Sequence, residues 1–280
     1  MSIKRMSIAL LSAVVLLAAC SRPKPAEETA SPQPVEPSYA QEAVSYSLDT
    51  TTLNGYVAYN QTDSAKRPGI IVVPEWWGVT DYVKTRANEL AKLGYVALVA
   101  DVYGNGKTAD NPTDAGALAT PFYQNPVLAK ARIDAAIAKL KTYSQVDTTK
   151  IGAIGYCFGG GVLLNTARLG NADLDAVVSF HGTLMGGVPA KKETLTARIL
   201  VCHGNADPLV PAKEVDAFKK EMDAVGATYT FKAYDSAQHA FTNPGATELG
   251  KKFNMPISYN AAADSASWDE MKKFLADALK

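Results

Sequence analysis

Short apolar runs alternate with longer amphipathic segments along most of the chain. The apolar runs are almost uninterrupted and rich in valine and isoleucine, and they cover residues 69–74, 95–100, 150–155, 175–180 and 198–203. Strands that are apolar on both faces are typical of a parallel sheet with helices on each side. The runs therefore predict the buried strands of such a sheet.

The segments between and after these runs have apolar residues three or four positions apart, as amphipathic helices do. They cover residues 81–93, 127–143, 162–169, 211–225 and 259–279. Repeated alternation of strand and helix predicts an α/β fold, with a doubly wound, mostly parallel sheet and right-handed crossovers. Two earlier β-prone segments, 44–48 and 53–59, flank a threonine-rich stretch and predict an antiparallel hairpin at the sheet edge.

The first twenty residues have the three parts of an export signal. A positively charged start is followed by apolar residues 8–17, which are too few to span a bilayer stably. Leu-Ala-Ala-Cys at 17–20 resembles the bacterial lipobox, in which signal peptidase cuts before a cysteine that carries lipid. We expect residues 1–19 to be a lipoprotein signal peptide and Cys20 to be lipidated. An ordinary cleaved signal peptide that ends near a cysteine is the alternative.

Residues 20–42 contain five prolines and few large apolar side chains, so they cannot bury enough surface to offset the entropy of ordering. They are predicted to form a disordered tether between Cys20 and one folded domain, 43–280. The protein is therefore expected to be an exported, periplasm-facing lipoprotein, held to a membrane by its lipid. Ser21 is not the aspartate that retains lipoproteins at the inner membrane, which favours the outer membrane.

Charge and cysteine content narrow the class of protein. The 28 Lys and Arg balance the 28 Asp and Glu, and no basic run is present, so nucleic-acid binding is disfavoured. Cys157 and Cys202 remain besides Cys20, and both lie beside glycine-rich strand ends. A disulfide between them is one possibility in an exported protein, although disulfides usually occupy loop positions in stapled domains.

A glycine-rich turn follows the predicted strand at 150–155. Gly-Tyr-Cys-Phe-Gly-Gly-Gly at 155–161 has the spacing of a nucleophile elbow, G-x-S-x-G, with Cys157 in place of serine. The glycines permit a sharp strand-to-helix turn, which aims helix N–H groups at the sulfur and favours a thiolate. The alternative is a structural cysteine beside a phosphate-binding loop, but a Walker loop would need a lysine here.

A general base and its orienting acid follow in the chain order that this fold requires. His239 lies in a loop between the β-prone residues 228–234 and the last predicted helix. Asp207 directly follows a strand, and its carboxylate could accept the Nδ1 proton of His239. Its plainer role would be a turn aspartate. The two other histidines, His181 and His203, are expected to line a pocket or to be structural.

These residues resemble the dienelactone hydrolase family of the α/β-hydrolase fold over most of the predicted domain. Five ordered motifs carry the resemblance: Glu-Trp-Trp-Gly at 75–78, Asp-Val-Tyr at 101–103, Gly-Tyr-Cys-Phe-Gly-Gly at 155–160, Gly-Asn-Ala-Asp-Pro-Leu-Val-Pro at 204–211 and His-Ala-Phe at 239–241. The resemblance implies that Cys157, His239 and Asp207 form a catalytic triad.

The same resemblance implies three further roles. Glu75 would hydrogen-bond the resting thiol and take its proton when substrate arrives, although an ordinary solvated carboxylate is its plainer interpretation. The backbone N–H groups of Trp76 and Phe158 would form the oxyanion hole. A thiol that stays neutral until substrate binds would suit an exported enzyme, because it resists oxidation.

One departure from the family bears on the substrate. Family members that act on dienelactone hold its carboxylate with two arginines, and this chain has Asn105 and Asn243 in those places. A buried carboxylate without a cation is costly. The expected substrate is therefore an uncharged small-molecule ester, lactone or thioester, in a pocket with Trp77, Tyr103 and Tyr123, besides Trp76.

The sequence as a whole predicts a carboxylic ester hydrolase that works through an acyl-enzyme intermediate. The cysteines and histidines form no ligand cluster, so neither a metal nor an organic cofactor is expected. A thioesterase or peptidase on the same scaffold is one alternative. A membrane-tethered binding protein that retains the fold without catalysis is the other, and the intact Cys157, Asp207 and His239 argue against it.

Overall fold

The computed structural model describes residues 36–280, which form one compact unit around a single eight-stranded sheet. The predictions for the signal peptide, Cys20 and most of the tether lie outside these residues. The strands are β1 (Tyr39–Leu48), β2 (Thr51–Asn60), β3 (Arg67–Val73), β4 (Val96–Val99), β5 (Val146–Tyr156), β6 (Ala176–Phe180), β7 (Arg198–Gly204) and β8 (Tyr229–Tyr234). Their order across the sheet is β1-β2-β4-β3-β5-β6-β7-β8.

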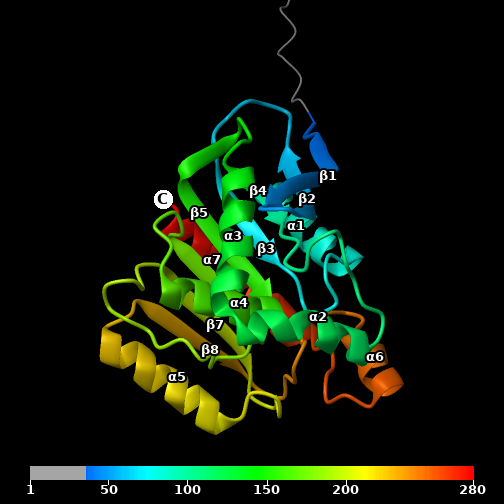
Figure 1. Ribbon diagram of the computed structural model, residues 1–280, viewed down its shortest axis with the longest axis vertical. Helices are drawn as coiled ribbons and strands as arrows, with labels where there is room; N and C mark the ends of the chain where they lie inside the picture. The colour runs from blue at the N-terminus through cyan, green and yellow to red at the C-terminus, as the bar shows by residue number, and fades with distance from the viewer. Residues whose placement is uncertain (1–35) are drawn as a thin grey trace, which may run out of the picture. The chain divides into compact units, whose positions relative to one another are not determined.

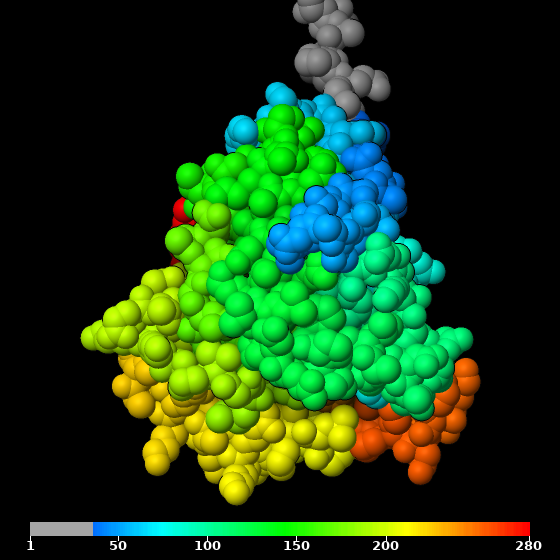
Figure 2. Space-filling model, in the orientation of Figure 1, coloured from blue at the N-terminus to red at the C-terminus, as the bar shows by residue number. Residues whose placement is uncertain are grey.

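Only the hairpin departs from a parallel arrangement. Strands β1 and β2 pair antiparallel, β2 pairs antiparallel with β4, and every pair from β4 to β8 is parallel. The predicted mostly parallel sheet with an antiparallel hairpin at its edge is confirmed. Figure 2 shows β1, in blue, on the surface of the molecule.

Helices cover both faces of the sheet. They are α1 (Asp81–Lys92), α2 (Pro112–Gln124), α3 (Pro126–Leu140), α4 (Phe158–Leu169), α5 (Ala212–Val225), α6 (Ala246–Phe253) and α7 (Ala261–Ala278). Ile133 of α3 and Phe218 of α5 belong to the core on one face, and Leu90 of α1 and Leu275 of α7 to the core on the other. In Figure 1, α3 and α4 lie in front of the sheet and α7 behind it.

The folded unit begins earlier than the sequence predicts. Strand β1 starts at Tyr39, so residues 39–42, assigned above to the tether, pair with β2. The prediction placed the boundary too late because alternation of half-buried and exposed side chains in this edge strand resembles the polar tether that precedes it. Within residues 36–280, the helices are too short or too polar to cross a membrane.

Candidate active site

Cys157 lies at the sharp turn between β5 and α4. Its backbone has φ 52° and ψ −115°, which is unusual for a residue with a side chain. A Cβ atom added at Gly155 would lie 2.4 Å from the Gly159 oxygen, and one added at Gly159 would lie 2.3 Å from the Val73 oxygen. The turn therefore requires glycine two residues before and two residues after the cysteine.

His239 and Asp207 meet beside this turn. The Asp207 Oδ2 atom lies 2.8 Å from His239 Nδ1, and both side chains are buried. The two loops are tied together by the Ala206 N–H, which donates to the Ala237 oxygen. Asp207 Oδ1 accepts a hydrogen bond from the Leu209 N–H, which fixes the carboxylate. The structure thus brings the three predicted triad residues to one edge of the sheet.

The charges around His239 favour the imidazolium form. Burial lowers the pKa of His239, but the neighbouring Cys157 and the hydrogen-bonded Asp207 act in the opposite direction, and the net pKa is raised to about 10. A cationic ring next to a sulfur atom favours a thiolate, which is the nucleophilic form of cysteine. The arrangement can therefore generate a nucleophile at neutral pH.

Glu75 follows β3 and is almost fully buried, but its partner differs from the one expected. Its Oε2 atom accepts a 2.7 Å hydrogen bond from Asn243 Nδ2, and no bond joins Glu75 to the Cys157 thiol within residues 36–280. The Asn243 amide is oriented by the Gly245 N–H, which donates to its Oδ1 atom. Burial raises the pKa of Glu75 to about 7, against the opposing effects of Asn243, His239 and Arg86.

Two backbone N–H groups beside the cavity, those of Phe158 and Trp76, have no acceptor within residues 36–280. Phe158 is the first residue of α4, where an N–H has no partner within the helix. Tyr103 holds the Trp76 loop, since its hydroxyl donates to the Trp76 oxygen at 2.9 Å.

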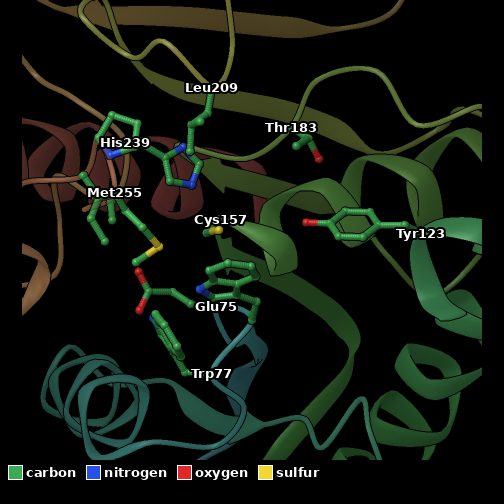
Figure 3. Close-up of a pocket in the computed structure, with 12 residues that line it drawn as sticks. Glu75, Trp77, Tyr123, Cys157, Thr183, Leu209, His239 and Met255 are labelled. Carbon is green, nitrogen blue, oxygen red and sulfur yellow. The ribbon is translucent and has the colours of Figure 1, made fainter. Parts of the chain in front are cut away.

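A cavity of about 260 Å³ opens above the cysteine. Its lining comprises Glu75, Trp76, Trp77, Tyr123, Cys157, Thr183, Leu209, His239, Ala240, Met255, Pro256 and Ile257. Figure 3 shows Cys157 near the centre, with Glu75 and His239 to one side and the Tyr123 hydroxyl directed toward it from the other. Trp76, Trp77 and Tyr123, three of the residues predicted for the pocket, line this cavity, and its walls are mainly apolar.

Three predicted pocket residues lie outside the lining. Asn105 is in an exposed turn with φ 57°, and its N–H donates to the Thr52 oxygen, so its predicted place in the pocket is wrong. Tyr103 and Asn243 are buried behind the lining and support Trp76 and Glu75 respectively. The prediction for Asn105 rests on analogy with a family arginine. In this structure the turn directs position 105 away from the cavity.

Sequence reasoning missed part of the cavity wall. Thr183 follows β6 and Leu209 follows Asp207, so their positions after strands at the same edge could have indicated them. Met255 comes from the connection between α6 and α7, which carries no comparable signal. Neither His181 nor His203 lines the cavity, and both are buried.

Neither described cysteine forms a disulfide. Cys157 and Cys202 are both free thiols, so the possible disulfide between them is absent. In the part of the chain that the structure describes, no cluster of histidine, cysteine and carboxylate side chains could hold a metal ion.

Comparisons with known proteins agree on one family. A model of the dienelactone hydrolase family matches residues 53–279. Protein usf of Aquifex pyrophilus is 31% identical over 204 residues, covering 71% of this chain and 86% of that protein. A Methylorubrum extorquens protein that carries the name carboxymethylenebutenolidase is 31% identical over 184 residues, covering 62% of this chain and 63% of that protein.

Solved structures agree with these sequence matches. A dienelactone hydrolase-like promiscuous phosphotriesterase from metagenomic libraries superposes with a TM-score of 0.80 and 32% identity, covering 86% of this chain and 99% of that one. A structure named m3DLH superposes with a TM-score of 0.81 and 31% identity over the same shares of the two chains.

Proposed function

This chain belongs to the dienelactone hydrolase family and is a hydrolase, and we propose that it cleaves uncharged carboxylic esters, lactones or thioesters with Cys157 as its nucleophile. The observation that carries the proposal is the 2.8 Å contact of His239 with Asp207 beside a cysteine held on a strained turn. Nucleophile, base and orienting acid in this order are the parts of a hydrolytic triad.

The proposed reaction has two steps. The Cys157 thiolate attacks the carbonyl carbon, and the oxyanion accepts hydrogen bonds from the N–H groups of Trp76 and Phe158, each contributing about 3 kcal/mol. The C–O or C–S bond to the leaving group breaks, and His239 gives that group a proton. His239 then takes a proton from water, the hydroxide attacks the acyl-enzyme, and the thiolate leaves.

Glu75 is the proposed acceptor of the thiol proton. A carboxyl whose pKa is raised to about 7 by burial can take or release a proton near neutral pH. Its Oε2 atom accepts from Asn243 Nδ2 at 2.7 Å, and its Oε1 atom has no hydrogen-bond partner within residues 36–280, so Oε1 is the proposed acceptor.

The cavity supports an uncharged substrate. Neither lysine nor arginine is among the lining residues in the described part of the chain. Asn243 is a neutral amide that donates to Glu75 and accepts from the Gly245 N–H, and it is not among the lining residues, so it supplies no positive charge to the cavity. A negatively charged substrate would lose its hydration without gaining a lysine or arginine partner, and the one cationic ring in the lining, His239, is already paired with Asp207.

We also propose that Cys20 is lipidated and that the hydrolase domain is tethered at the outer membrane, facing the periplasm. Sequence alone supports this: a short apolar segment ends in Leu-Ala-Ala-Cys and is followed by a proline-rich stretch. Labelled palmitate fed to bacteria that produce the chain should enter the parent protein and not Cys20→Ser. Equal labelling of the two, or of neither, would contradict the lipid anchor.

Exchange of each described cysteine in turn tests the proposed nucleophile. Cys157→Ala should lower kcat/KM for p-nitrophenyl acetate by more than about 1000-fold, because the reacting atom is removed. Cys202→Ala is the matched control, since Cys202 is a free thiol buried in the core. It should keep the parent kcat/KM at the cost of some stability. Unchanged turnover by Cys157→Ala would refute the proposal.

A further inference from the structure

We propose that His181 is a positioning residue that sets the geometry between the Cys157 sulfur and the His239 imidazole. The inference rests on the proposed function, and it adds a residue that does not line the cavity and touches no substrate. His181 lies just beyond β6, between the nucleophile turn and the loop that carries His239. Its two ring nitrogens each bind one of these two segments.

The first nitrogen holds the nucleophile turn. The Cys157 N–H donates to His181 Nδ1 at 3.1 Å and to the Phe180 oxygen at 3.0 Å. A backbone N–H shared by an imidazole nitrogen and a carbonyl is fixed from two directions. His181 therefore restrains the backbone atom next to the side chain that bears the sulfur.

The second nitrogen holds the base loop. Because Nδ1 accepts a hydrogen bond, the ring proton lies on Nε2, which donates to Thr242 Oγ1 at 2.7 Å. Thr242 is three residues beyond His239. It is held as well by the Tyr82 hydroxyl at 2.7 Å and by Arg86 Nη2, which donates to its carbonyl oxygen at 2.7 Å. The base loop thus has a fixed attachment point.

The His181 ring also packs directly on the base. Its centroid lies 5.4 Å from that of His239, with the two rings at 62°. The Phe241 ring packs on His181 as well, with the ring centroids 5.2 Å apart and the planes at 78°. His181 is 1% exposed, so the ring cannot shift without moving these neighbours.

Backbone strain occurs at both residues that the first of these hydrogen bonds joins. Cys157 has φ 52° and His181 has φ 41°, and neither is glycine. Residues with side chains persist in this region only where surrounding contacts hold them, and they gather at functional sites. The hydrogen bond from Cys157 to His181 joins the two strained residues, which indicates that each holds the other.

The connection works only with a neutral His181. A proton on Nδ1 would place a donor against the Cys157 N–H and break the contact. Burial and the nearby His239 lower the pKa of His181 well below its ordinary value, so the ring stays neutral where His239 is charged. Two adjacent histidines can therefore serve different purposes, one as a rigid spacer and one as the base.

The test uses Thr242, at the far end of the connection. Thr242→Val removes the acceptor of His181 and should lower kcat about tenfold or more with KM little changed, because small displacements of reacting groups are costly. Alkylation of Cys157 by iodoacetamide is followed in the full-length chain by site-resolved mass spectrometry. Its pH dependence should shift to higher pH. Thr242→Ser restores the hydroxyl and should restore both kcat and the alkylation profile.

A second variant and a control keep the result interpretable. His181→Asn keeps an acceptor near the Cys157 N–H but loses the contact with Thr242, so its effect should not add to that of Thr242→Val in the double variant. Ser179→Ala alters a buried residue of β6 whose hydroxyl has no partner within the described residues, and its kinetics should match the parent. Thermal unfolding of each variant identifies loss of folding.

The outcomes separate this inference from the proposed nucleophile. A folded Thr242→Val with the parent alkylation profile and kcat would overturn the role of His181. Full additivity of His181→Asn and Thr242→Val would also overturn it. Alkylation is measured without substrate, so it decides the role of His181 even if Cys157→Ala proves active and the proposed nucleophile fails.

Discussion

At the scale of single residues, Glu75 is a buried carboxyl near the cysteine whose ionised form is poorly stabilised. Its carboxyl is 3% exposed and its hydrogen-bond donor is the neutral amide of Asn243. A buried carboxylate with an uncharged donor pays most of its desolvation cost, and this cost disfavours the ionised form. Because Asn243 is neutral, it gives the Glu75 carboxylate no opposite charge, which favours the protonated form. It also adds no positive charge to the pocket.

This protonation predicts a pH dependence of stability. Burial raises the pKa of Glu75 from 4.5 in the unfolded chain to about 7, so the folded state binds more protons between these values. Its contribution is fully present below pH 4.5 and is lost as the pH rises through about 7. The loss amounts to about 3 kcal/mol, since one pKa unit corresponds to about 1.4 kcal/mol.

Urea unfolding of the parent and Glu75→Gln at several pH values measures this effect. The glutamine variant cannot ionise, so its free energy of unfolding should rise relative to the parent between about pH 4 and pH 8. Other titrating groups largely cancel in the difference. Parallel curves for the two proteins across this range would show that Glu75 carries no raised pKa.

At the scale of elements, the sequence predicts the strands better than the helices. The run at 69–74 corresponds to β3 and the run at 95–100 to β4, because strands buried on both faces must be apolar throughout. Helix α4 begins at Phe158, ahead of the predicted 162, although its first turn is mostly glycine, a poor helix former. Close contacts with β3 and β6 override that propensity.

Two helices were not predicted from the sequence, for different reasons. Helix α2 contains Pro121, which conceals its periodicity, yet Asn111 accepts a hydrogen bond from the Asp114 N–H and precedes a proline, which is a start signal present in the sequence. Helix α6 has eight residues and a glycine, so its pattern is too short to recognise. Helix α2 contributes Tyr123 to the cavity lining, and Phe253 of α6 stacks on the lining residue Trp77.

The residues of the site also divide into those that the sequence predicts and those that it does not. Cys157, Asp207 and His239 could be found from sequence because each follows a strand whose carboxyl end lies at one edge of the sheet. The position of Asn105 could not be predicted from sequence, because it depends on the path of a turn that bends away from the cavity. His181 could be seen as a strand-end residue, but its contacts with Cys157 and Thr242 depend on tertiary structure.

At the scale of the whole domain, the layered sheet brings four segments together at one cavity. Glu75 follows β3, Cys157 follows β5, Asp207 follows β7 and His239 follows β8. Helices on both faces leave the carboxyl edge of the sheet as the place where side chains from distant parts of the chain can meet. The family match over residues 53–279 covers all of these segments.

Direct detection of the acyl-enzyme tests the central claim. The full-length chain is mixed with p-nitrophenyl acetate, quenched in acid before turnover is complete, digested and analysed by mass spectrometry. The account predicts one acetyl group on the peptide that contains Cys157, removed by hydroxylamine, with Cys202 unmodified and no adduct in Cys157→Ala. Acetylation at another residue, or hydrolysis without any adduct at Cys157 under conditions that trap thioesters, would contradict it.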